Sequence, residues 1–349
     1  NFYNQRLAFF TLIVILIIVA LFGPVTKDYI IMHITAGIMV VILTKETRYW
    51  SKFFLLLMLL LATYTFTYLF LTYIKNNNLN DFNINSIWWI CLNVFLTLLA
   101  YPLIPLLERL FGFTSSITLA ELSDLNNNLL KELSIKAPGT FQHVLHVATL
   151  AEAASEKIGA NSTMARVGAL YHDIGKMKNP FNFTENQNNV NPHDSLDCVT
   201  SAKIIIEHVP EGVRIGKKFG LPSVIIEFIK THHGTTKVEY FYRKFMKEHA
   251  DHPVDEKVFT YPGPKPKSKE QVIVMLADTV EAAVKSLMNP TEEEINEMVD
   301  KLIKAKIESG QLDRSEMTFE DVQVCTRIFK TMLVNMNHIR IAYPDSEVK

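Results

Sequence analysis

Long apolar stretches dominate the first part of the chain. No charged residue occurs between Leu7 and Thr26, and this segment is apolar on every face, as expected of a helix surrounded by lipid rather than by a protein core. Three further apolar stretches follow it, at 29–44, 53–74 and 82–107. We therefore predict a membrane region over 1–111 with about four transmembrane helices, of which the second is the shortest and contains His33.

The charges between these stretches predict how the helices are oriented. Lys45, Arg48 and Lys52 lie between the second and third stretches, whereas the loop 75–86 before the fourth contains a single lysine and several asparagines. Because positively charged residues mark the cytosolic side of a membrane, the loop 45–52 and everything after the fourth helix are predicted to be cytosolic. The expected location is the cell membrane, with the lipid bilayer as a partner of the helices.

Beyond the membrane region the apolar residues take up helical spacing. Over 112–139 they predict a helical connector, which Thr118 and Glu121 open as a capping box and Pro138-Gly139 ends. From 140 to 349 amphipathic helical patterns alternate with polar loops, and no convincing run of residues alternates with a period of two. We expect an all-α fold, in which transmembrane helices precede a cytosolic helical bundle.

The net charge and the cysteines narrow the range of functions. With a formal net charge of −1, the chain lacks the strongly basic character of proteins that bind nucleic-acid polymers through their phosphates. Its three cysteines are widely separated, and none belongs to a CxxC pair. Neither a disulfide framework nor a thiolate metal site is therefore expected.

Histidine and aspartate residues carry the predicted chemistry. Imidazole and carboxylate groups are ligands for transition metals such as iron, manganese or zinc. Each candidate lies within or at the end of a predicted helix, and a helical bundle can direct such side chains toward one centre. The candidate ligands are His143, His172, Asp173, His208, His232, His233 and Asp278.

The order of these residues matches a known metal set. His143, the pair His172-Asp173 within HDIGK and then Asp278 resemble the H…HD…D set of the HD phosphohydrolase superfamily. The segments PGTFQHVLHVATLAEAA, FTENQ, NPHD, HHGT, YPGP and MLADTVEAA narrow the resemblance to the seven-transmembrane HD proteins, the PgpH type of cyclic di-AMP phosphodiesterase. The similarity covers 108–345 closely. The four apolar stretches resemble the C-terminal part of that family's membrane region, so three further helices and an extracytoplasmic domain are expected outside this sequence.

The resemblance implies a site with two divalent ions, iron or manganese. It implies one ion at His143, His172, Asp173 and Asp278 and a second at Asp173, His208, His232 and His233. A hydroxide between the ions would attack one phosphodiester of a cyclic dinucleotide and convert cyclic di-AMP to pApA. Lys176, one turn after the HD pair, is the candidate for holding a substrate phosphate, so Asp173 and Lys176 are the predicted catalytic residues.

Alternative functions for the same residues stay open. A cyclic di-GMP phosphodiesterase of the HD-GYP type shares the two-metal chemistry, but HHGTTKVEY lacks the GYP tripeptide. Nucleotide phosphohydrolases of the superfamily typically use a one-metal set, which would leave His208, His232 and His233 unexplained. A non-catalytic receptor that senses a nucleotide usually lacks one or more ligands, whereas every expected position is filled here. A homodimer formed through the membrane or connector helices stays open as well.

Overall fold

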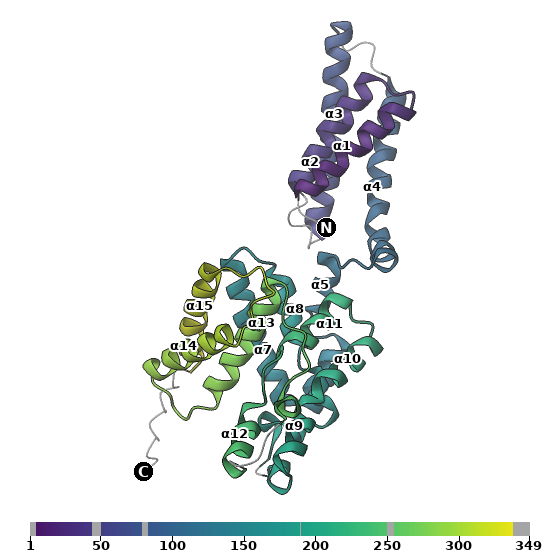
Figure 1. The fold of residues 1–349 in the computed structure, drawn as a ribbon. Helices are drawn as coiled ribbons and strands as arrows, with labels where there is room; N and C mark the ends of the chain where they lie inside the picture. Colours follow the sequence, from purple (N-terminus) through teal and green to yellow (C-terminus); the bar gives the residue numbers. More distant parts are fainter. Residues whose placement is uncertain (1–4, 44–49, 79–82, 189, 250–254, 338–349) are drawn as a thin grey trace, which may run out of the picture. The chain divides into compact units, whose positions relative to one another are not determined.

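The structure divides into two compact units. Figure 1 shows the computed structural model, which describes residues 5–43, 50–78, 83–188, 190–249 and 255–337. One unit comprises Asn1–Ala120 and contains the predicted membrane helices, and the other comprises Glu121–Lys349 and contains the candidate ligands. The boundary falls inside the predicted connector at 112–139, and each unit has its own buried residues.

The N-terminal unit is formed by consecutive apolar helices. They are α1 (Gln5–Phe22), α2 (Lys27–Leu43), α3 (Trp50–Asn76) and α4 (Ile84–Phe111). Each helix packs against the next one along the chain (Figure 1). A small core within the unit includes Ala36, Leu60 and Ile90. Large apolar side chains such as Phe10 and Trp88 stay exposed on the unit. Exposed apolar surface of this extent is typical of helices that contact lipid.

The four helices differ in their capacity to cross a membrane. Within the described chain, α1 and the 52–76 part of α3 are long and apolar enough, and α4 adds a third span if its parts 84–100 and 102–108 act together across a 46° bend. The expectation of about four spans requires α2 to cross the membrane as well, but this helix is too short to do so upright. Its uncharged part, 29–43, is only about 23 Å long, whereas the hydrocarbon core of a bilayer is about 30 Å thick. The loop 44–49, whose charges support the predicted orientation, lies outside the described residues.

The connector differs from the single helix that its sequence predicts. It forms two helices, α5 (Ser116–Leu122) and α6 (Asn128–Lys136), separated by a turn. In this turn the Asp124 carboxylate accepts a hydrogen bond from the backbone N–H of Asn126 at 2.9 Å. Aspartate and asparagine side chains compete for backbone groups in this way, and they interrupt a helix that apolar spacing alone would continue.

The predicted start of the connector helix is wrong, and its predicted end is confirmed. Thr118 and Glu121 form no capping box, because the Thr118 hydroxyl donates to the Glu108 carboxylate at 2.7 Å instead. α6 ends at Lys136, directly before Pro138, and Pro138 occupies the first turn of the next helix, α7 (Pro138–Lys157). Proline is favoured there, since the N–H groups of a first turn have no partner within the helix.

The C-terminal unit is a helical bundle. Its centre consists of α7, α8 (Ser162–Tyr171) and α13 (Lys269–Lys285), which pack against one another (Figure 1). Against this centre lie α14 (Glu292–Glu308) and α15 (Phe319–Asn337). The remaining helices are α9 (Cys198–Ile206), α10 (His208–Lys218), α11 (Ser223–Thr231) and α12 (Glu239–Glu248). α11 contacts α8, α10 contacts α11, and α12 contacts α9.

α13 passes through the core of this bundle. All residues from Val272 to Ala277 are fully buried, so the helix is covered on every side. Burying a large apolar side chain contributes about 1.5–3 kcal/mol, and a capping box between Ser268 and Gln271 fixes the start of the helix. The backbone that carries Asp278, one residue beyond this run, is therefore held firmly.

The described part of the chain is helical apart from turns and loops. The polar segment after the HD pair is ordered by short 3-10 turns at Ile174–Lys178, Pro180–Asn182, Thr184–Asn186 and Pro192–Ser195. The β pairing found in the described residues is one isolated bridge between Lys237 and Thr260. The predicted all-α fold is confirmed.

Candidate metal centre

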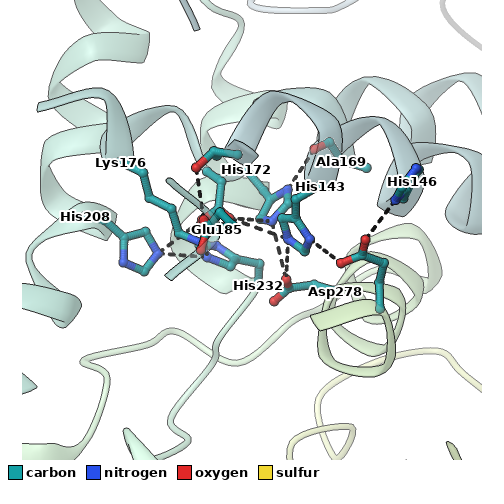
Figure 2. A network of polar contacts seen from close by, with 12 residues as sticks. His143, His146, Ala169, His172, Lys176, Glu185, His208, His232 and Asp278 are labelled. Carbon is teal, nitrogen blue, oxygen red and sulfur yellow. Dashed lines mark hydrogen bonds and ion pairs between the residues drawn. The ribbon is translucent and has the colours of Figure 1, made fainter. Parts of the chain in front are cut away.

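Separate helices of the bundle deliver the seven candidate ligands to one buried place. Figure 2 shows His143, His172, His208, His232 and Asp278 among them. Two lie within helices, and five stand at helix ends. They are His143 in α7, Asp278 in α13, His172 and Asp173 after α8, His208 at the start of α10, and His232 and His233 after α11. Apart from His233, which is partly exposed, these side chains are buried. The structure thus brings together every residue that the sequence predicts as a ligand.

Three imidazoles are held by carbonyl groups at the ends of helices. In each case the ring Nδ1 lies within hydrogen-bond distance of the carbonyl oxygen three residues earlier. The pairs are His172 with Ala169 (2.7 Å), His208 with Ile205 (2.6 Å) and His232 with Ile229 (2.8 Å). Because the carbonyls of a last helical turn have no partner within the helix, Nδ1–H donates to them, and Nε2 is the nitrogen that loses its proton when the ring becomes neutral. In its neutral form each of these rings therefore offers the lone pair of Nε2.

The ligand atoms form two groups, and Asp173 lies between them. Within each group the atoms lie at most 4.8 Å apart: His143, His172, Asp173 and Asp278 in the first, and His208, His232 and His233 in the second. The Asp173 Oδ2 lies 3.6 Å from Nε2 of His143 and 3.3 Å from Nε2 of His172. Its Oδ1 lies 3.4 Å from Nε2 of His208 and 3.6 Å from Nε2 of His232. One carboxylate therefore faces both groups.

Three polar atoms at this centre are buried without a hydrogen bond from the described residues. They are Nε2 of His172 and both carboxylate oxygens of Asp173, of which Oδ2 forms an ion pair with the Lys176 ammonium. Such atoms are rare in proteins and indicate a missing partner. Since imidazole nitrogens and carboxylate oxygens suit divalent transition metals, the donor set and these atoms both fit a cation in each group.

The two groups differ in their electrostatics. Burial alone would lower the pKa of His143, but hydrogen bonds to Asp278 and Glu281 raise it to about 9. The pKa of His172 likewise rises to about 10, because the charge of Asp173 outweighs burial. In the second group, burial and the charge of His172 lower the pKa of His232 to about 3. The first group therefore releases protons when a cation binds, whereas the second already offers neutral rings.

Lys176 lies beside the centre, but its ammonium already has two partners (Figure 2). Its Nζ is 2.7 Å from Oδ2 of Asp173 and 3.0 Å from Oε1 of Glu185. It also lies 5.0 Å from the ring centre of Phe183. A substrate phosphate at Lys176 would therefore share the ammonium with these carboxylates.

Glu185 and Asn186 have no predicted role in the sequence analysis, yet they fix the segment next to Lys176. The Asn186 side-chain oxygen accepts hydrogen bonds from the backbone of Gly139 (2.9 Å) and Thr140 (3.2 Å), and the Thr140 hydroxyl donates to Glu185 at 3.0 Å. A Cβ at position 139 would lie 1.8 Å from the backbone oxygen of Glu185, so only glycine fits. The segments FTENQ and PGT both belong to the family resemblance, and the close contact between them holds the loop that carries Glu185 against the start of α7.

Glu281 is a third residue without a predicted role. Its carboxylate contacts Nδ1 of His143 and, at 2.9 Å, Nδ1 of His146. Burial raises the pKa of Glu281, but these bonds outweigh burial and lower it to about 2. The position three residues after Asp278 places both carboxylates on one face of α13, which is the signal the sequence offers. His146 therefore contacts Glu281 and belongs to neither group of candidate ligands.

A cleft of about 960 Å³ opens beside the centre. The ligands His143, His233 and Asp278 line it, together with Lys176 and Tyr261. The Tyr261 ring stacks on His233 with 4.2 Å between ring centres. The volume is at the upper end of the range of small-molecule sites, so a ligand larger than a single nucleotide fits.

Two family models match the chain. The HD domain model matches residues 140–283, which include all seven candidate ligands. A second model, described as a 7TM receptor with intracellular HD hydrolase, matches residues 1–115.

Curated relatives are similar over most of the chain. The chain is 41% identical to the cyclic-di-AMP phosphodiesterase PgpH of Bacillus subtilis over 254 residues. This aligned region covers 72% of this chain and 35% of that protein. Its identity to PgpH of Listeria monocytogenes is 42% over 251 residues, with the same coverage. An uncharacterized protein of Synechocystis is 36% identical over 331 residues, and the aligned region covers 91% of this chain and 40% of that protein. The chain thus spans about 35% of the length of the PgpH relatives.

Solved structures resemble the C-terminal unit. The HD domain of L. monocytogenes PgpH matches with a TM-score of 0.58 and 42% sequence identity, over 61% of this chain and 100% of that one. The same domain in complex with cyclic-di-AMP matches with a TM-score of 0.58 and 43% identity, over 62% of this chain and 99% of that one.

Proposed function

Because the chain belongs to the family of seven-transmembrane proteins with an intracellular HD hydrolase domain, we propose that its helical bundle is a metal-dependent phosphodiesterase of cyclic dinucleotides. Cyclic di-AMP is the expected substrate and pApA the expected product. Support comes from the relatives named for this activity and from the solved domain that binds cyclic-di-AMP. The observation that carries the proposal is the single carboxylate of Asp173, which faces two groups of ligands beside a large cleft.

The proposed cofactors are two divalent transition-metal ions, iron or manganese. His143, His172, Asp173 and Asp278 would hold one ion, and Asp173, His208, His232 and His233 would hold the other. Two such ions supply positive charge for the phosphoryl oxygens and lower the pKa of the water that attacks phosphorus. The shared carboxylate of Asp173 would keep them close enough to act on one phosphodiester.

The protein residues would orient the ligands and the substrate. Glu281 and the helix-end carbonyls hold the imidazole rings with Nε2 toward the centre. The ammonium of Lys176 would contribute positive charge next to the phosphoryl group that reacts. No side chain would be needed as the nucleophile, because a water molecule would take that role.

We also propose that residues 1–111 anchor the enzyme in the cell membrane and that 112–139 connect them to a cytosolic catalytic domain at 140–349. The apolar helices α1 and α3 and the match to the membrane family model support the anchor. Protease protection of the chain in sealed inverted vesicles tests the sidedness. Cleavage of the bundle from the cytosolic side is expected, and full protection would contradict this orientation.

Substrate choice can be tested directly with the full chain in detergent. The protein is loaded with manganese or iron and incubated with cyclic di-AMP and cyclic di-GMP side by side, and the products are separated. We expect pApA from the adenine substrate and no product with Asp173→Ala. Rapid cleavage of the guanine substrate alone would reject the assignment. Binding without turnover would favour the non-catalytic receptor.

A further inference from the structure

A lysine outside the HD domain model lines the same cleft as the candidate ligands. Lys306 belongs to α14, beyond the residues 140–283 that the model matches, and it shares the cleft with His143 and Asp278. Its side chain is partly buried. Within the described part of the chain, its ammonium forms no hydrogen bond or ion pair.

The other lysines of the cleft are engaged or peripheral. Lys176 is held by two carboxylates, and Nζ of Lys237 lies 2.7 Å from Glu256. Lys285 is exposed at the surface. Lys306 is therefore the partly buried cation of this cleft whose charge has no direct counter-ion in the described residues.

The end of α14 is anchored to the segment that follows the paired histidines. The buried Gln311 side chain accepts a hydrogen bond from the backbone of Thr235 at 2.9 Å, and its own backbone donates to the carbonyl of Lys306 at 3.1 Å. The Lys265 ammonium adds a bond to the carbonyl of Gly310 at 2.7 Å. These contacts fix the backbone of Lys306 relative to the second group of ligands.

The surroundings of Lys306 favour a bound anion. Burial lowers its pKa to about 8, although the charges of Asp278 and Glu239 raise it. A partly desolvated ammonium gains more from a charged phosphate than an exposed one does, because water screens the interaction less. A cyclic dinucleotide contains two phosphodiester groups. While one is cleaved at the centre, the other needs a counter-charge elsewhere in the cleft.

We propose that Lys306 binds the second phosphodiester of the cyclic dinucleotide, the one that is not cleaved. This inference rests on the proposed function and adds to it a specificity residue outside the predicted set. It implies that the cleft distinguishes ligands with two phosphodiesters from those with one, although both kinds react at the same centre.

The experiment compares two substrates in the full, metal-loaded chain. Cyclic di-AMP has two phosphodiesters, whereas bis(p-nitrophenyl) phosphate has one and reports only on the metal centre. The variants are Lys306→Met, Lys306→Arg, and Lys304→Met as the matched control, since the Lys304 side chain is 75% exposed on the same helix. For Lys306→Met we expect KM for cyclic di-AMP to rise roughly tenfold or more, as for a lost charged hydrogen bond, with unchanged hydrolysis of the single diester. Lys306→Arg should restore most of the KM, and Lys304→Met should resemble the wild type.

The outcomes separate this inference from the proposed function. Normal kinetics of Lys306→Met with cyclic di-AMP would overturn the role of Lys306 and leave the phosphodiesterase assignment intact. Equal losses with both substrates would also overturn it, because they would show a structural effect on the metal centre. Absence of cyclic di-AMP cleavage by the metal-loaded wild type would overturn the proposed function and this inference with it.

Discussion

Replacing Glu281 with glutamine tests whether this carboxylate positions a metal ligand. The buried Glu281 side chain contacts Nδ1 of both His143 and His146, and its low pKa of about 2 keeps it charged at neutral pH. Glutamine has nearly the same shape, but it offers one oxygen acceptor and one amide donor. It can therefore accept a hydrogen bond from only one of the two rings.

The size of the effect follows from where the two rings lie. His146 is half exposed, so it can turn to water at little cost, and the glutamine oxygen can stay with His143. The remaining bond changes from charge-assisted to neutral, a loss of about 1–1.5 kcal/mol. Because 1.4 kcal/mol corresponds to a factor of ten, affinity for one ion should fall about tenfold, within the range known for residues that support metal ligands.

Chelator competition on the full chain measures this loss. Glu281→Gln should weaken one ion about tenfold and leave the other nearly unchanged, because the second group of imidazoles does not contact Glu281. His146→Gln is the control, and it should change either affinity less than threefold, since Glu281 keeps its bond to His143. Wild-type affinities for both ions in Glu281→Gln would refute the positioning role.

Three further predictions concern protons, a close backbone contact and a stacked ring. Because His143 and His172 have pKa values of about 9 and 10 without a cation, they must lose protons when metal binds. Metal affinity should therefore rise with pH up to about 10 and then level off. Calorimetry in buffers of different ionisation enthalpy should detect proton release at pH 7, and its absence would contradict these values. Gly139→Ala should destabilise the protein by about 1–3 kcal/mol, because the new methyl meets the backbone of Glu185; unchanged thermal unfolding would contradict that contact. Tyr261→Ala should lower stability by about 3 kcal/mol through loss of a buried ring, measured by the same unfolding, and no loss would show that the ring is not packed as described.

The sequence could indicate the candidate ligands because their signal is local. HDIGK and the paired histidines stand at helix ends, where adjacent side chains can reach the same centre. The bundle needed only helical periodicity to be recognised as all-α. All seven candidate ligands lie together at the expected centre, and their role as ligands stays a prediction: His143, His172, Asp173, His208, His232, His233 and Asp278.

The residues that the sequence did not reveal act through contacts between distant segments. Glu281 contacts His143 across 138 positions, and Gln311 contacts Thr235 across 76. Spacing within α13 places Glu281 on the same face as Asp278, but spacing within one helix does not identify the distant residue that a side chain contacts. The prediction of a single connector helix was wrong for another reason. Apolar spacing does not reveal the polar turn around Asp124, where side chains compete for hydrogen bonds with the backbone.

Anomalous X-ray scattering from crystals of the metal-loaded protein tests the central claim most directly. Data collected at the absorption edge of manganese or iron should show two peaks, one on each side of the Asp173 carboxylate. His143, His172 and Asp278 should surround one peak, and the three remaining histidines the other. A single peak, or peaks away from Asp173, would contradict a phosphodiesterase that works with two ions at this centre.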